Sequence, residues 1–144
     1  MHLETPNLAP SSELAREAHK REGAANPFIS LANLQEQCLG DDILQECLAE
    51  MVSYSCSYTE TLCRFAQIVA KGQSSNEGEA RAEIERVRSR THDATIDAIN
   101  ILSRALKSAG RDNSWISKMA GNRASYGKFA MLIAFEDVLT NQRG

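Results

Sequence analysis

Residues 79–109 form one of the two longest segments of the chain without glycine or proline, and this segment limits the possible folds most. Gly78 precedes it and Gly110 follows it, and glycine is the residue that most often closes the C-terminal end of a helix. Apolar and small side chains recur in steps of three and four, the spacing of one helix face. That face comprises Ile84, Val87, Thr91, Ala94, Ala98, Ile101 and Ala105, and a second row beside it comprises His92, Thr95, Ile99, Leu102 and Leu106. We therefore expect one long helix whose C-terminal half is buried on more than one side.

A second long helix is predicted from Asp41 to about Ala70, just before Gly72. Its apolar stripe alternates steps of four and three and comprises Leu44, Leu48, Met51, Ser55, Tyr58, Leu62, Phe65 and Val69. The polar turn KGQSSNEG, residues 71–78, joins the two long helices, and so short a connection predicts an antiparallel hairpin. In that hairpin the bulky Met51, Tyr54 and Tyr58 would face the small Thr91, Ala94 and Ala98.

Shorter helices are predicted on both sides of this hairpin. Ser30 is placed to cap a helix that ends near Leu39, and Asn122 or Ser125 opens the last helix, after a short one that stops at Gly121. Residues 11–22 predict another short helix, and residues 1–10 predict a mobile tail. No strand pattern occurs. The predicted fold is therefore an all-α bundle of about five helices built on the hairpin, with residues 11–144 forming a single helical domain.

Charge and cysteine spacing exclude several classes of protein. A net charge of -3 gives no overall attraction for nucleic acid or an anionic membrane. No segment approaches the ~20 apolar residues of a membrane span, and the N-terminus lacks the basic and apolar parts of a signal peptide, so we expect a cytoplasmic protein. The four cysteines, none in a C-x-x-C pair, predict buried thiols rather than a zinc site or disulfides. They are Cys38, Cys47, Cys56 and Cys63.

The charged side chains of the 79–109 helix gather in a polar row that is open to two interpretations. The row comprises Arg86, Arg90, Asp93, Asp97, Asn100, Arg104 and Lys107. Asp93 and Asp97 lie one turn apart, where like charges cost a few tenths of a kcal/mol. The row is either a solvated face, with ion pairs to a neighbouring helix, or a site in which the two acids hold a cation or a basic partner.

Arg88 and His92 also lie one turn apart, but on the apolar side of the same helix. A buried charge without a partner is costly. One interpretation is therefore structural, with both side chains bound to an acid on another helix, either Glu136 or Asp137. The other is functional. The candidate binding residues are then Arg88, His92, Asp93, Asp97 and Arg104, and we predict no catalytic residue, metal ligand or cofactor.

The stretch Arg88-x-x-x-His92-Asp93-Ala94-x-Ile96-Asp97, followed by Leu102-Ser103-Arg104, resembles the signature of a family of small bacterial helical proteins. In that signature Asn is more frequent where this chain has Asp93 and Ser103. The resemblance covers about a fifth of the chain. It implies an all-helical bacterial protein and brings no activity with it, because the family has no established function.

The favoured prediction is a non-enzymatic bacterial interaction or regulatory module, with another protein or a second copy of the chain as partner. One alternative is a metal-dependent phosphohydrolase that uses His92 and Asp93, with His19 and Asp137 as further ligands. A second alternative is a nucleic-acid-binding regulator, based on four arginines within residues 81–90 and a helix-turn-helix at 112–138. Glutamates interleave with those arginines, and the second helix of that motif is strongly apolar. The fingerprints of nucleotide-binding loops, serine hydrolases, zinc proteases and EF-hands are all missing.

Overall fold

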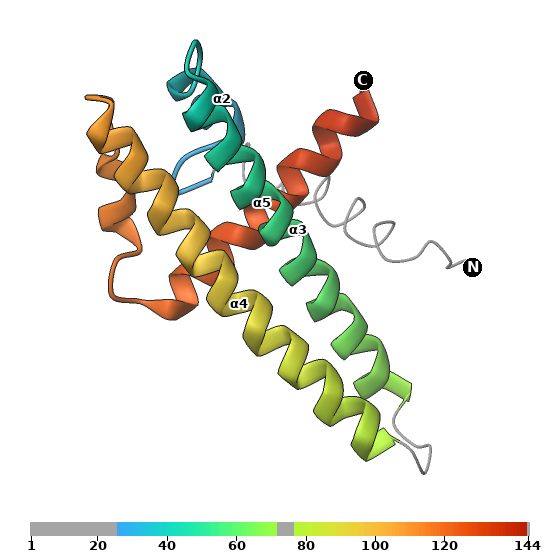
Figure 1. The fold of residues 1–144 in the computed structure, drawn as a ribbon. Helices are drawn as coiled ribbons and strands as arrows, with labels where there is room; N and C mark the ends of the chain where they lie inside the picture. Colours follow the sequence, from blue (N-terminus) through green and yellow to red (C-terminus); the bar gives the residue numbers. More distant parts are fainter. Residues whose placement is uncertain (1–25, 72–76, 144) are drawn as a thin grey trace.

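A computed structural model describes residues 26–71 and 77–143 of the chain. These ranges contain α2 (Leu31–Gln37), α3 (Asp42–Lys71), α4 (Glu77–Ser108), the 3-10 helix η1 (Ser114–Lys118) and α5 (Arg123–Arg143). They contain no strand, so the predicted all-α class is confirmed for this part of the chain. Figure 1 shows α3 and α4 side by side, with α5 passing across both. The predicted tail at 1–10, the predicted helix at 11–22 and turn residues 72–76 lie outside the described residues.

The helix ends follow the capping residues in the sequence. Ser30, Asp41 and Asn122 each accept a hydrogen bond from the backbone N–H three residues further on, at 3.1, 3.1 and 3.2 Å. Each side chain thereby satisfies one of the N–H groups that have no partner in the first turn of a helix. Gly110 ends α4 with φ of 74°, a left-handed conformation that residues with a Cβ adopt at a cost.

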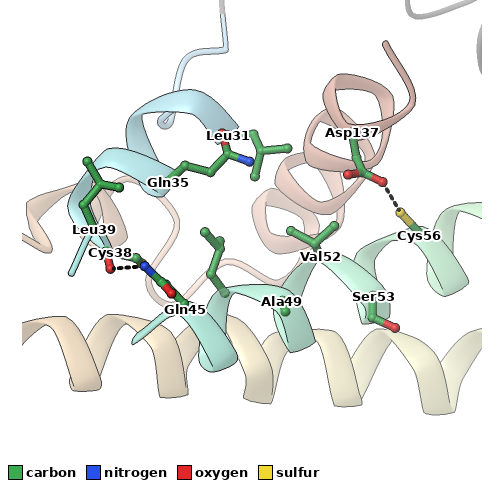
Figure 2. Close-up of a pocket in the computed structure, with 11 residues that line it drawn as sticks. Leu31, Gln35, Cys38, Leu39, Gln45, Ala49, Val52, Ser53, Cys56 and Asp137 are labelled. Atoms are coloured by element: carbon green, nitrogen blue, oxygen red, sulfur yellow. Dashed lines mark hydrogen bonds between the residues drawn. The ribbon is translucent and has the colours of Figure 1, made fainter. Parts of the chain in front are cut away.

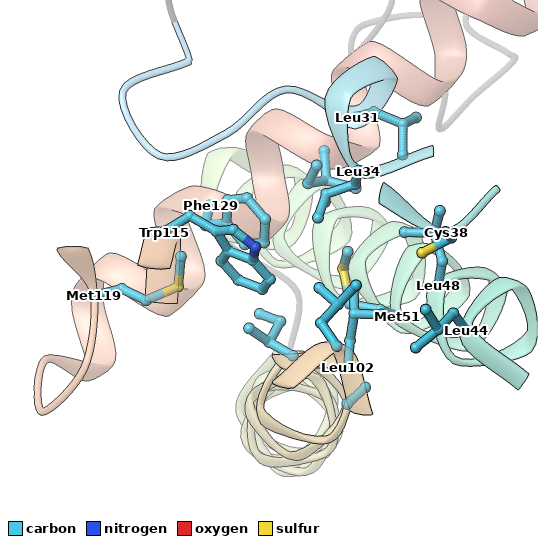
Figure 3. Packing of buried hydrophobic residues seen from close by; sticks show 14 of the residues in the cluster. Leu31, Leu34, Cys38, Leu44, Leu48, Met51, Leu102, Trp115, Met119 and Phe129 are labelled. Carbon is cyan, nitrogen blue, oxygen red and sulfur yellow. The ribbon is translucent and has the colours of Figure 1, made fainter. Parts of the chain in front are cut away.

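The hydrophobic core lies where α2, α3, α4 and α5 meet, as Figure 3 shows. Phe129 of α5 is completely buried at its centre. Trp115 of η1 stacks on it with ring centroids 5.9 Å apart, and Phe28 meets it edge-on at 5.6 Å. Met51 of α3 and Leu102 of α4 complete this centre and are also fully buried. The short η1 segment thus closes one side of the bundle with an aromatic side chain.

Burial along the two long helices differs from the sequence prediction. In α4 the second row is covered from Thr95 onwards, with Thr95, Ile99, Leu102 and Leu106 no more than 1% exposed, whereas Ile101 of the first row is 47% exposed. In α3 the stripe is buried as far as Tyr58, and Val69 near its end is 44% exposed. The reason is the position of α5, which covers the middle of the pair and not its far end (Figure 1).

Of the bulky and small side chains predicted to face one another, Met51, Tyr58 and Ala98 are buried. The prediction is wrong for the Tyr54 side chain, which is 42% exposed. Tyr54 instead contributes its backbone carbonyl, which accepts a hydrogen bond from Thr95 Oγ1 at 3.2 Å. None of the helices in the described ranges combines the length and apolar character that crossing a bilayer requires.

Candidate functional site

His92 forms the centre of a polar cluster between α4 and the start of α5. Its Nε2 lies 3.2 Å from the backbone carbonyl of Arg123, and its Nδ1 lies 3.2 Å from Arg123 Nη2. The same guanidinium nitrogen donates to Asp93 Oδ1 at 2.5 Å. Arg123, the first residue of α5, therefore contacts two consecutive side chains of α4.

These contacts determine the protonation state of the imidazole. A guanidinium can only donate, so Nδ1 must accept and the ring proton must sit on Nε2, where it is donated to the carbonyl of Arg123. Burial, and then the charge of Arg123, lower the pKa of His92 from its ordinary value of 6.5. The hydrogen bond from Arg123 lowers the pKa of the Asp93 carboxyl. The cluster is therefore a neutral histidine beside an exposed Arg–Asp ion pair.

Tyr58 of α3 stacks on the imidazole of His92, with ring centroids 5.0 Å apart. Gly127 of α5 faces this pair. A Cβ at position 127 would lie 3.1 Å from the Tyr58 hydroxyl and 3.4 Å from His92 Nε2. Gly127 thus allows α5 to approach α3 and α4 closely enough for Arg123 to reach His92.

A pocket of about 520 Å³ opens beside these rings. Arg88 and Lys128 bring positive charge to it, and Met131, Leu132 and Phe135 of α5 line it with apolar surface. Hydrogen bonds that Arg88 donates to the Glu85 carboxylate raise the pKa of Arg88, whose Nη2 lies 2.8 Å from Glu85 Oε1. We call this hollow the Arg88 pocket. Its full lining consists of Tyr58, Arg88, His92, Ala124, Gly127, Lys128, Met131, Leu132 and Phe135.

The structure brings together three of the five predicted binding residues. Arg88 and His92 line the Arg88 pocket, and Asp93 pairs with Arg123, which also contacts His92. Asp97 and Arg104 are exposed further along α4. In the described part of the chain, neither makes a hydrogen bond or ion pair to the other three. The five candidate binding residues therefore do not form one cluster.

The predicted partners of Arg88 and His92 are wrong. Glu136 points to α2, where its Oε1 accepts a hydrogen bond from the backbone N–H of Leu31 at 2.7 Å. Asp137 accepts a hydrogen bond from the thiol of Cys56 at 3.7 Å. Both acids lie on the part of α5 that faces α2 and α3. They are therefore too far along α5 to contact Arg88 and His92 of α4.

The ligand set of the metal-dependent alternative is not assembled around His92. Both ring nitrogens contact Arg123, and Asp93 pairs with the same residue. Asp137 belongs to a different contact, and His19 lies outside the described residues. Within residues 26–71 and 77–143, no three side chains of the His, Cys, Asp or Glu type gather closely enough to hold a metal ion.

A second hollow, of about 530 Å³, lies between α2, α3 and α5. Figure 2 shows side chains from all three helices around it, with Asp137 and Cys56 at one end and Gln45 and Leu39 at the other. Burial and the neighbouring Asp137 raise the pKa of the Cys56 thiol to about 12, so that this thiol stays protonated. We call this hollow the α2–α3–α5 groove.

Sequence reasoning missed Lys128, the role of Gly127 and the pairing of Arg123. One signal was present, since a glycine inside an otherwise apolar helix often marks a close approach. Comparison of this chain with protein-family models, with curated proteins and with solved structures found no match. The function is therefore inferred from the geometry just described.

Proposed function

We propose that this chain is a non-enzymatic interaction or regulatory module that binds another protein through the Arg88 pocket. The observation that carries the proposal is the combination of an apolar floor with a positively charged rim. Beside it, both ring nitrogens of His92 contact Arg123, and Asp93 pairs with the same guanidinium.

The chemistry of the pocket indicates what it would bind. Lys128 attracts a carboxylate beside Arg88, whose guanidinium already pairs with Glu85, and Met131, Leu132 and Phe135 favour an aliphatic or aromatic side chain. A partner segment in which acidic and large apolar residues alternate supplies both. Asp97 and Arg104 are exposed further along α4, outside the pocket lining.

The test is quantitative capture from a bacterial lysate with the intact chain as bait. The informative variant is Lys128→Glu, which reverses the charge at the rim, and the matched control is Lys107→Glu, an exposed lysine near the end of α4. We expect wild type and Lys107→Glu to retain the same proteins and Lys128→Glu to lose them. Identical retention by all three would contradict the proposal.

The remaining expectations belong to the same proposal. We infer that α3 and α4, with the segment between them, form one antiparallel hairpin in a bundle of about five helices. The order of contacts supports this, because Tyr54 meets Thr95 whereas Tyr58, further along α3, meets His92, which is earlier in α4. Membership of the bacterial family that the Arg88–Arg104 stretch resembles, a cytoplasmic location and self-association are proposed with it.

A further inference from the structure

We infer that the α2–α3–α5 groove receives a basic amphipathic helix of a partner protein. The inference rests on the proposal that the chain is an interaction module. It uses a different surface from the Arg88 pocket, however, so the two can fail separately.

The shape of the groove suits a helix. Its walls on α3 come from side chains in steps of three and four, from Gln45 to Cys56, which spans about 16 Å at ~1.5 Å per residue. That length corresponds to about three turns of a docked helix, whose anchors recur with the same spacing. Leu31, Leu48 and Val52 line the groove with apolar surface, and Leu39 at its edge is 63% exposed.

The charge around the groove selects a basic partner. Residues 26–63 contain no lysine, arginine or histidine, and they supply most of the groove lining. Their six acids are Glu36, Asp41, Asp42, Glu46, Glu50 and Glu60. Among the described residues, only Glu60 of these six forms an ion pair, with Arg64. The field of the other five is therefore not cancelled by contact with a cation, and it attracts positive charge.

Two cations from outside this segment contact its backbone: Lys118 Nζ donates to the carbonyl of Phe28 at 3.4 Å, and Arg111 lies at the end of α2. Its Nη1 donates to the backbone carbonyls of Gln37 and Leu39, at 2.7 and 2.8 Å. It thus caps the C-terminal end of α2, where carbonyl groups lack helical partners. It adds positive charge at one end of the groove, and Asp137 adds negative charge at the other end.

Asp137 is the carboxylate that lines the groove directly. Its Oδ2 accepts hydrogen bonds from Cys56 at 3.7 Å and from Asn141 at 3.5 Å. Its Oδ1 has no hydrogen bond within the described ranges and can accept one from a lysine or arginine. The neighbouring Glu136 is occupied by the N-terminus of α2. A helix lying along α3 could therefore place apolar side chains over Val52 and a basic side chain at Asp137.

Binding of synthetic peptides to the full chain, followed by fluorescence anisotropy, tests the inference. The probe is a helical peptide of about 18 residues with leucines in steps of three and four and lysines elsewhere. The matched control peptide carries glutamate in place of each lysine. We expect the basic peptide to bind at least about tenfold more tightly than the acidic one, with an affinity that falls as salt is raised.

Protein variants locate the binding. Val52→Lys should weaken binding of the basic peptide at least about tenfold, because it places a charge on the apolar wall. Asp137→Asn should weaken it less. Ile101→Lys, at an exposed apolar residue of α4 outside the groove, is the control and should leave binding unchanged. Equal binding of both peptides, or no effect of Val52→Lys, would overturn the inference. Lys128→Glu tests the Arg88 pocket alone and should not change this binding.

Discussion

The imidazole of His92 is held in its neutral form by a residue that is itself charged. Arg123 donates to Nδ1 and accepts from Nε2–H, so a second ring proton would remove one hydrogen bond and place two cations in contact. Arg88 adds to this repulsion, and Asp93 offsets part of it. Tyr58 covers one ring face. The pH dependence of stability should therefore report on this single contact.

Lowering the pH from about 7.5 to about 5 should reduce the free energy of unfolding through His92. Its pKa is lower in the folded chain than the ordinary 6.5, so the unfolded chain binds more protons as the pH falls through 6.5. The contribution of neutral His92 to the free energy of unfolding is complete above pH 6.5 and is lost below it. Denaturant unfolding at several pH values measures this, and His92→Gln should flatten the dependence. The same slope in both proteins would contradict the assignment.

The contribution of Asp93 to stability is lost only below pH 3.8, in a separate pH range.

Replacing Gly127 should show how closely α5 approaches the Tyr58–His92 pair. A Cβ would already lie 3.1 Å from the tyrosine hydroxyl, so Gly127→Leu should cost about 1–3 kcal/mol, the usual range for overpacking. Ala124→Leu, at an exposed position one turn earlier, should change stability by less than about 0.5 kcal/mol. Thermal unfolding of the two variants is the measurement. Equal effects would mean that the approach is not tight.

At the scale of elements, the short helix α2 depends on α5. It has seven residues, too few to be stable alone, and Glu136 of α5 binds its first backbone N–H at 2.7 Å. Glu136→Ala should therefore cost about 1–2 kcal/mol, as the loss of a capping carboxylate does. Glu46→Ala, at an exposed residue of α3, is the control. Denaturant unfolding distinguishes them, and equal stability of both variants would show that the cap is dispensable.

The C-terminal end of α4 depends on a glycine with positive φ. Gly110→Ala should cost about 1 kcal/mol, because φ of 74° brings a Cβ too close to the backbone. Gly78→Ala is the matched substitution in the first turn of the same helix, where a Cβ meets no atom within 4 Å. It should raise stability by up to about 1 kcal/mol, because alanine favours the helix. Thermal unfolding should show changes in stability of opposite sign for the two variants. A gain in stability at both positions would contradict the role of Gly110.

For the whole molecule, stability should be distributed unevenly along the two long helices. Met51, Ile99 and Phe129 are fully buried where α5 crosses, whereas Val69 and the start of α4 are open to solvent. Amides near Met51 and Ile99 should therefore exchange hydrogen only on global unfolding, and those at 65–71 and 77–87 through local opening. Hydrogen exchange with peptide-level mass spectrometry measures this. Uniform protection along α3 would show that the far end has further support.

The local features of this fold could be predicted from the sequence. The all-α class, the starts of the helices at Ser30, Asp41 and Asn122, and the end at Gly110 follow from helix spacing and capping chemistry, which act within a few residues. The same spacing placed Arg88, His92 and Asp93 on adjacent faces of one helix. These predictions succeeded because the groups that determine them are neighbours along the chain.

The tertiary structure alone decided which distant groups meet. Whether Arg123 or an acid would face His92, and whether Glu136 would bind α4 or cap α2, depended on where α5 crosses α3 and α4. That position follows from packing around Phe129 and from the missing side chain of Gly127, which involve four elements at once. The sequence by itself thus determined the helices and their buried faces in outline. The crossing of α5 determined the site, because polar partners are chosen by three-dimensional proximity and not by spacing along the chain.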